Sequence, residues 1–302
     1  MSDDLLPGFA EHWIETAVGR IFARSAGSGP PVVMLHGFPQ THVCWHRIAP
    51  ALAETHHVVC LDLRGYGRSS APPGGPQHET YSKRAMGRDV VAVMDQLGHR
   101  RFALVGHDRG ARVGYRLALD QPDRLDRLVL LDILPTFYVW RQVRAGVVPA
   151  AHWDFLSRPY PQPEQEIARD PVPFFNGLLV KWTGDGTLGC FDPRALAAYH
   201  APCGEADRIH AFCEDYRAGA TVDLNMDEED LKLGRTISCP VLAVWGGKFY
   251  LTGRPGAETT LEVWQRTFAP QATGAPLDAG HFLAEEDPAD VLSALRRFLN
   301  SR

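Results

Sequence analysis

Residues 102–113 read FALVGHDRGARV: an apolar run, a turn rich in small residues, and then a helix-forming segment. The run predicts a buried strand and the final segment predicts a helix. Glycine at positions 106 and 110 fits a turn too sharp for a nearby Cβ, and such a turn lifts the Asp108 side chain out of the sheet edge. A carboxylate held in this way can displace a leaving group from saturated carbon and form an ester. We therefore interpret Asp108 as a catalytic nucleophile.

The composition of the 302-residue chain is ordinary for a globular protein, with 45% apolar and 22% charged residues. The net charge is −5 without a large basic cluster, so no nucleic acid partner is expected. No apolar run reaches the length of a membrane span, and the first residues lack the apolar core of a signal peptide. We expect a cytoplasmic protein with no membrane partner. The six cysteines lack C-x-x-C spacing, which predicts buried thiols and no metal site.

Strand and helix signals alternate along most of the chain. Apolar runs predict strands at residues 13–18, 21–23, 32–36, 57–61, 102–105, 128–131, 241–245 and 275–277. Amphipathic patterns predict helices at residues 45–52, 83–97, 111–119, 261–267 and 291–299. This alternation predicts an α/β fold with a mostly parallel eight-stranded sheet and helices on both faces. The first two strands, joined by the short link Gly19-Arg20, predict an antiparallel hairpin.

The alternation stops from about residue 135 to residue 235. There the chain is rich in proline and aromatic residues and breaks into short helical pieces, before a strand signal resumes at residues 241–245. We predict a helical cap at residues 135–235, inserted between the sixth and seventh strands. The core would then consist of residues 1–134 and 236–302.

Four motifs follow one another in an order shared with a known superfamily. They are residues 36–39 (HGFP), residues 62–69 (DLRGYGRS), the turn around Asp108, and residues 280–282 (GHF). Over nearly its whole length the chain resembles an α/β-hydrolase with a lid between the sixth and seventh strands. For residues 62–69 we favour a structural role in turns over a catalytic role.

The resemblance implies a base and an orienting acid. His281 follows the last predicted strand, where the catalytic histidine of the family resides. Most relatives place the acid after the seventh strand, but residues 245–250 (WGGKFY) contain no carboxylate. Asp132 ends the sixth strand in an apolar context, where an unpaired carboxylate would be costly to bury. We therefore predict a triad of Asp108, His281 and Asp132, with a simple strand-end cap as the alternative role for Asp132.

The backbone N–H groups of Phe38 and Arg109 are expected to form an oxyanion hole. Phe38 follows the His36-Gly37 turn, and Arg109 directly follows the nucleophile. The hole would serve the second half-reaction, in which water deprotonated by His281 attacks the carbonyl of the aspartyl ester. The alternative role of the Phe38 side chain is packing against the lid.

Arg109 and Arg112 stand about one helical turn apart at the start of the helix after the nucleophile. Epoxide hydrolases and haloalkane dehalogenases with this turn commonly have an aromatic residue after the aspartate, which suits neutral substrates. A guanidinium binds a carboxylate through two parallel hydrogen bonds. We therefore predict that both arginines bind a substrate carboxylate. Alternatively, they neutralise Asp108 or pair with surface acids such as Asp123.

An aspartate nucleophile with a carboxylate clamp implies a 2-substituted carboxylic acid as substrate. In this respect the chain resembles the fluoroacetate and haloacetate dehalogenases, in which a His-Trp pair and a tyrosine of the cap bind the halide. His152, Trp153 and Tyr216 match this set by order and local context. Trp153 and Tyr216 could alternatively be core aromatics. Trp182 and Lys181 are weaker candidates for the pocket wall and entrance.

The predicted activity is hydrolytic dehalogenation of fluoroacetate or chloroacetate to glycolate. No cofactor or metal is required, because Asp108 and water supply every bond that forms. The resemblance suggests a homodimer. The sequence does not predict the preference for fluoride or chloride, the chain length and stereochemistry of the substrate, or the role of the loop at residues 246–250.

Three other functions compete with this prediction. An epoxide hydrolase would share Asp108 and His281 but needs two cap tyrosines, and it gives no reason for two arginines beside the nucleophile. The tyrosine candidates are Tyr138, Tyr160, Tyr199 and Tyr216. A non-catalytic binding protein is disfavoured because all three catalytic groups are present. A serine-type esterase is disfavoured because attack by an aspartate on an ester would give an anhydride.

Overall fold

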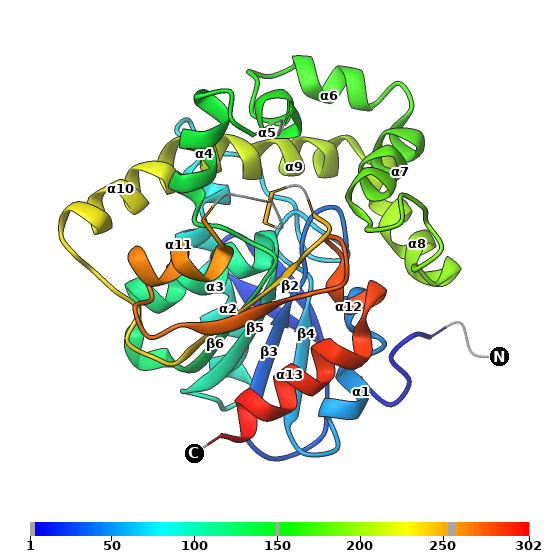
Figure 1. The fold of residues 1–302 in the computed structure, drawn as a ribbon. Coiled ribbons are helices and arrows are strands. Elements are labelled where there is room, and N and C mark those ends of the chain that lie inside the picture. The colour runs from blue at the N-terminus through cyan, green and yellow to red at the C-terminus, as the bar shows by residue number, and fades with distance from the viewer. Residues whose placement is uncertain (1–3, 149–150, 250, 253–257, 302) are drawn as a thin grey trace.

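The computed structural model describes residues 4–148, 151–249, 251–252 and 258–301. Its centre is a sheet of eight strands in the order β1-β2-β4-β3-β5-β6-β7-β8 (Figure 1). The pairs β1–β2 and β2–β4 are antiparallel, and all other neighbours are parallel. The strands are β1 (Ala10–Thr16), β2 (Gly19–Ala26), β3 (Pro31–Leu35), β4 (His57–Leu61), β5 (Phe102–His107), β6 (Leu125–Leu131), β7 (Val241–Gly246) and β8 (Thr273–Leu277). The predicted α/β fold with a mostly parallel eight-stranded sheet is confirmed.

The predicted antiparallel hairpin at the start of the chain is confirmed, but the link expected at Gly19-Arg20 is wrong. These two residues begin β2, and the chain turns at Ala17-Val18. β1 and β2 pair antiparallel from Ala10 opposite Ser25 to Thr16 opposite Gly19. Farther into the sheet, every residue of β5 is buried. A strand covered on both faces has no polar side, which explains why its sequence reads as a continuous apolar run and not as an alternating one.

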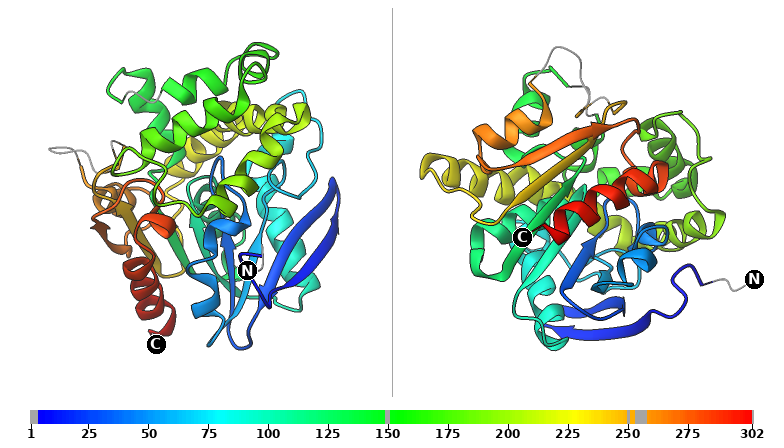
Figure 2. Two further views of the ribbon diagram at one scale, coloured as in Figure 1. Left: turned by 90° about the vertical axis from the view of Figure 1, so that its right-hand side faces the viewer. Right: turned by 60° about the horizontal axis from the view of Figure 1, so that its bottom comes forward.

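Helices cover both faces of the sheet, as predicted. In the left view of Figure 2, α13 lies on one side of the sheet and α2 on the other. The helices are α1 (Ala49–Leu52), α2 (Lys83–Gln96), α3 (Arg109–Asp120), α4 (Thr136–Arg144), α5 (Ala151–Leu156), α6 (Gln162–Ile167), α7 (Pro171–Trp182), α8 (Pro193–His200), α9 (Ala206–Ala218), α10 (Leu224–Lys232), α11 (Thr260–Arg266), α12 (Leu283–Glu286) and α13 (Pro288–Asn300). Single turns of 3-10 helix occur at His42–Trp45, Glu79–Tyr81, Pro122–Arg124 and Ala201–Gly204.

The helix predicted at residues 45–52 is wrong in its extent. The structure has a 3-10 turn at His42–Trp45 and a separate short helix, α1. Pro50 lies in the first turn of α1, where its missing N–H costs nothing. A helix running through this position from Trp45 would lose a backbone hydrogen bond and clash with the proline ring.

Between β6 and β7 the chain forms helices α4 to α10, which we call the cap. Figure 1 shows these green and yellow helices above the sheet. A π-helical turn at Gly219–Asp223 joins α9 directly to α10. Such turns occur mostly inside α-helices and often at functional sites. The cap covers the edge of the sheet at which β5 ends, and Asp108 directly follows that strand.

Candidate active site

Asp108 lies at the tip of a sharp turn between β5 and α3. Its φ of 42° and ψ of −112° lie outside the helical and extended regions. The two glycines of the turn leave no room for a side chain. A Cβ on Gly106 would lie 2.5 Å from the backbone of Ala111, and one on Gly110 would lie 2.4 Å from the carbonyl oxygen of Leu35. This close packing agrees with the prediction that the turn is too sharp for a Cβ at positions 106 and 110.

The carboxylate of Asp108 is buried but surrounded by positive charge and donors. The backbone N–H of Phe38 donates to its Oδ2 at 3.1 Å. Burial alone would raise the pKa of Asp108, but His281, Arg109 and Arg112 outweigh it, so the pKa lies below its ordinary value. Asp108 is thus an anion near neutral pH, which the predicted role of a nucleophile requires. The N–H of Phe38, a predicted oxyanion-hole donor, faces the group that would become the ester.

His281 and Asp132 form a hydrogen-bonded pair between Nδ1 and Oδ2. Asp132 follows β6 with a φ of 55°, and its other oxygen accepts hydrogen bonds from Gly246 N at 2.8 Å and Thr252 Oγ1 at 2.7 Å. Burial by itself would lower the pKa of His281, but the hydrogen bond and charge of Asp132 raise it above its ordinary value. The pairing leaves Nε2 of His281 as the nitrogen available for proton transfer.

The loop after β7, whose role the sequence left open, contacts His281. The ring of Phe249 stacks on that of His281 with centroids 4.5 Å apart and planes 30° apart. Phe249 and Leu251 line the same cavity as Asp108. Tyr250 lies outside the described residues. Instead of a carboxylate, this loop contributes two apolar side chains to the cavity.

The guanidinium of Arg109 is anchored by the cap. Its Nε donates to Oδ1 of Asp215 at 3.1 Å, and its Nη2 donates to the backbone oxygen of Asp215 at 2.9 Å. The same guanidinium lies 4.2 Å from the centre of the Tyr216 ring. Arg109 is not among the described residues that line the cavity. It contacts Tyr216, which does line the cavity.

Arg112, one turn further along α3, does line the cavity with Asp108. Its Nη1 donates to the carbonyl oxygen of Leu134 and to Oγ1 of Thr136, both at 3.0 Å. Its Nε is buried and has no hydrogen-bond partner among the described residues. The two arginines predicted as one clamp thus have different surroundings, and Arg112 is the one that lines the cavity with Asp108.

The structure brings the three predicted halide ligands together. The ring of His152 lies 6.4 Å from that of Trp153 and 5.8 Å from that of Tyr216, measured between centroids. Trp182 joins them, 4.6 Å from His152, whereas Lys181 is exposed. Burial lowers the pKa of His152 to about 3, so its imidazole is neutral at physiological pH. These side chains offer polar N–H and O–H groups without adding a full charge.

The cavity between core and cap is small, with about 10 Å³ open to the centre of a water molecule. That is close to the space needed for one water. A larger groove of about 720 Å³, beside α6 and α9, contains none of the predicted site residues. The described residues that line the small cavity are Asp108, Arg112, Asp132, His152, Trp153, Trp182, Tyr216, Phe249, Leu251 and His281.

Comparison with known proteins identifies the family of the chain. The model of the alpha/beta hydrolase fold family matches residues 30–288. The chain belongs to this family. It is 42% identical to a fluoroacetate dehalogenase from Burkholderia sp, over 98% of this chain and 95% of that protein. It is 31% identical to a soluble epoxide hydrolase from Corynebacterium sp. (strain C12), over 91% of each chain.

A solved structure is similar to this α/β-hydrolase over almost its full length. The protein, from Nostoc sp PCC 7120, carries a provisional alpha/beta hydrolase assignment and superposes with a TM-score of 0.92 at 46% identity. The superposition covers 98% of this chain and 99% of the other. The sheet, the cap and their relative arrangement therefore recur in an experimentally determined relative.

Sequence analysis missed several residues of this hydrolase site. His107 Nε2 is 2.8 Å from the backbone oxygen of His281, and burial lowers the pKa of His107 to about 3. His107 is a polar residue that ends an otherwise apolar strand directly before Asp108, and this position was the signal that it contacts the site. Thr252, Phe249 and Leu251 had no such signal, because their loop contains no recognisable motif.

The described parts of the chain contain neither a cluster of metal ligands nor a membrane-spanning helix. No three histidine, cysteine, aspartate or glutamate side chains gather there in a way that could hold a metal ion. No helix in these parts is long and apolar enough to cross a membrane.

Proposed function

We propose that this α/β-hydrolase removes the halide from a short 2-haloacid, converting fluoroacetate or chloroacetate to glycolate. The observation that carries the proposal is that the carboxylate of Asp108 and the guanidinium of Arg112 line the same small cavity. A cation beside an anionic nucleophile makes sense when the substrate is itself an anion that must be held against that nucleophile. The small cavity favours a substrate with few heavy atoms.

In the first half-reaction an oxygen of Asp108 attacks C2 of the haloacid, and the carbon–halogen bond breaks as the ester bond forms. Arg112 and Arg109 hold the substrate carboxylate. The departing halide takes the bonding electrons and is received by His152, Trp153 and Tyr216. Donors in a closed cavity replace the hydration that a free fluoride ion would have in water.

In the second half-reaction water attacks the carbonyl carbon of the Asp108 ester. Nε2 of His281 accepts the proton of the water, while Asp132 holds the imidazole through Nδ1. The N–H groups of Phe38 and Arg109 stabilise the oxyanion. Collapse releases glycolate and restores Asp108. The sum is haloacetate plus water giving glycolate, halide and one proton.

The similarity to a fluoroacetate dehalogenase over 98% of this chain supports the proposal. We further propose that residues 1–134 and 236–302 form the catalytic core and that residues 135–235 form the cap that selects the substrate. The homodimer and the cytoplasmic location expected from the sequence stay predictions. Light scattering after size-exclusion chromatography tests the first of them.

Epoxide hydrolysis is the second candidate, because an epoxide hydrolase is 31% identical over 91% of this chain. It would use the same nucleophile and base but needs two tyrosines at the substrate. Tyr216 lines the cavity, whereas Tyr138 is not among the described residues that line it. Tyr160 is 68% exposed, and Tyr199 donates to Glu285. The tyrosine set therefore favours dehalogenation.

The deciding experiment supplies the purified protein with fluoroacetate, chloroacetate and styrene oxide in separate assays. Free halide is followed with ion-selective electrodes and diol by chromatography. We expect halide release from the haloacids, lost in Asp108→Ala and retained in Asp123→Ala, an exposed aspartate outside the site. Diol formation without halide release would reject the proposal in favour of epoxide hydrolysis, and chloride release alone would restrict the substrate to chloroacetate.

A further inference from the structure

A buried carboxylate of the cap, Asp215, accepts hydrogen bonds from three core side chains. Lys83 and Arg109 donate to its Oδ1, and the hydroxyl of Tyr66 donates to its Oδ2 at 2.7 Å. Asp215 is 0% exposed, as is Tyr66, and Lys83 and Arg109 are each 1% exposed. Burial alone would raise the pKa of Asp215, but Arg109 and Lys83 lower it well below its ordinary value. The cluster thus joins two core cations through one cap anion.

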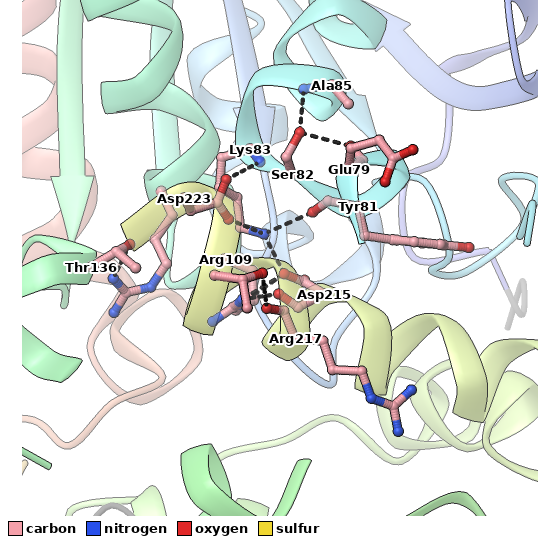
Figure 3. Close-up of polar contacts among 12 residues, drawn as sticks. Glu79, Tyr81, Ser82, Lys83, Ala85, Arg109, Thr136, Asp215, Arg217 and Asp223 are labelled. Atoms are coloured by element: carbon pink, nitrogen blue, oxygen red, sulfur yellow. Dashed lines mark hydrogen bonds and ion pairs between the residues drawn. The ribbon is translucent and has the colours of Figure 1, made fainter. Parts of the chain in front are cut away.

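Lys83 is held in turn by a second carboxylate of the cap. Its backbone N–H donates to Oδ1 of Asp223 at 2.8 Å, and its ammonium lies 3.7 Å from Oδ2 of the same residue. Figure 3 shows Lys83 between Asp223 and Asp215, with Arg109 also bound to Asp215. Asp223 ends the π-helical turn that begins at Gly219. Asp215 from α9 and Asp223 from the end of the π-helical turn therefore contact the same lysine.

The contacts fix Arg109 on three sides. Nε and Nη2 are bound by Asp215, and the planar face rests on the ring of Tyr216. A Cβ on Gly219 would lie 3.4 Å from Nη2, so the backbone closely follows the guanidinium. Nη1 donates to none of the residues that the structure describes. Nη1 is therefore the nitrogen of Arg109 that is left to bind a substrate carboxylate.

We propose that Lys83 and Asp215 are positioning residues that orient Arg109 toward the substrate carboxylate. The inference rests on the proposed function, since its main readout is the KM for a haloacid. Asp215 binds one edge of the guanidinium so that the other edge points to the substrate. Lys83 balances the charge of Asp215 and keeps its carboxylate in place. Neither residue touches the reacting atoms.

Two substitutions separate this role from a general effect of charge. Lys83→Met removes a positive charge, so a pure charge effect would weaken binding of an anion. Asp215→Asn removes a negative charge, so a pure charge effect would strengthen that binding. A positioning role predicts weaker binding in both variants, because Arg109 loses its orientation in each case. The signs differ only for Asp215→Asn, which makes this variant decisive.

The experiment measures KM and kcat for the haloacid that the wild type uses, together with inhibition by acetate. We expect KM to rise at least about tenfold in both variants, the value of one charge-assisted hydrogen bond, with a much smaller change in kcat. Lys83→Arg should restore most of the loss. Tyr66→Phe, which removes one donor to Asp215 and keeps the ring, should raise KM by a smaller factor.

Asp89→Asn is the matched control for Asp215→Asn. Asp89 is also buried, lies on α2 like Lys83, and accepts hydrogen bonds from Arg64 at 2.7 and 2.8 Å. We expect this variant to lose stability and to keep its KM. An unchanged or lowered KM in Asp215→Asn would overturn the inference.

If the wild type released no halide from any haloacid, the proposed function would fail instead. Calorimetric titration with acetate would then still test the orientation of Arg109. Weaker acetate binding in both variants supports the positioning role, and equal or tighter binding in Asp215→Asn rejects it.

Discussion

The core side and the cap side of this active site are built by different means. On the core side, Asp108 and Asp132 sit at strand ends with φ values of 42° and 55°, so the backbone itself sets their direction. On the cap side, His152, Trp153 and Tyr216 are placed by aromatic contacts with ring centroids between 5.8 and 6.4 Å apart. The first group depends on turns and the second on side-chain packing.

This difference has a consequence for substitutions. A change of side chain on the core side removes a chemical group but leaves the backbone turn that positioned it. A change on the cap side also alters the packing that positions its neighbours. We therefore expect core variants to separate the two half-reactions cleanly, and variants of the cap residues that line the cavity to alter the discrimination between halides.

The largest effect is expected for His281→Gln. The variant keeps the nucleophile, so it should release one halide per active site and then stop at the ester. Loss of a general base typically costs about 10² to 10⁴ in rate. Rapid-quench halide measurement and mass spectrometry of the trapped carboxymethyl ester test this expectation. Turnover at the wild-type rate would show that ester hydrolysis does not need His281. Absence of the first halide would show that formation of the ester needs it as well.

Acidification should act in the same direction as His281→Gln. His281 works as a base only when neutral, and Asp132 raises its pKa, so activity should fall at a higher pH than for an ordinary histidine. Below that pKa the rate of ester hydrolysis falls about tenfold per pH unit. Asp108, whose pKa is lowered, stays ionised over this range. We expect the ester to accumulate at low pH, which a pH series of the rapid-quench assay measures.

The core side was also the more predictable side. Its groups lie next to strand signals and short motifs, so Asp108, Asp132 and His281 could be named from position along the chain. The eight strands and the cap insertion followed from the same alternation of patterns. Their boundaries were less certain, as with β1, which begins at Ala10 and not at residue 13. Pairing with β2 lengthens it beyond its own apolar signal.

The contacts of the cap with the core were not predictable in this way. Arg109 and Arg112 were expected to act alike because they lie one turn apart on α3. Asp215, more than 100 positions later in the chain, binds Arg109 and gives it a different environment. Phe249 reaches His281 from a loop without any recognisable motif. Such contacts depend on how segments far apart in the chain pack together. The residues next to each partner in the sequence carry no signal for them.

Trp153→Phe tests the cap side. The variant keeps an aromatic ring beside Arg112, whose guanidinium lies 4.7 Å from the Trp153 ring, but it removes the indole N–H. A hydrogen bond to a charged group contributes about 1.5 to 3 kcal/mol, so the rate of fluoride release should fall about tenfold or more. Chloride release should fall less, because chloride is a better leaving group with weaker hydration. Parallel steady-state assays with both haloacids give the ratio.

Trp140→Phe is the control for this variant. Trp140 packs against Trp153 with centroids 5.2 Å apart but is not among the described residues that line the cavity. It should leave the ratio of fluoride to chloride release unchanged. An equal loss for both halides in Trp153→Phe would mean that the indole supports the cap without binding the halide.

The smallest effect on activity is expected for Glu285→Gln, on the core side behind the base. Glu285 is buried on α12, where it accepts a hydrogen bond from the hydroxyl of Tyr199 at 3.0 Å and another from Gln40. Burial raises its pKa from 4.5 to about 8. The folded state therefore favours the protonated acid, so its contribution to stability is complete below pH 4.5 and is lost as pH rises toward about 8.

Glutamine is neutral at every pH and has nearly the same shape, so the variant should lack this loss. Denaturant unfolding at pH 5.5 and 8.5 should show a smaller fall in the free energy of unfolding for Glu285→Gln than for the wild type. Turnover should stay close to that of the wild type, since Glu285 does not line the described cavity. Equal pH dependence in the two proteins would mean that Glu285 is ionised in the folded state. A large loss of turnover would instead mean that Glu285 helps to position His281. The core side of the site would then depend on side-chain packing, as the cap side does.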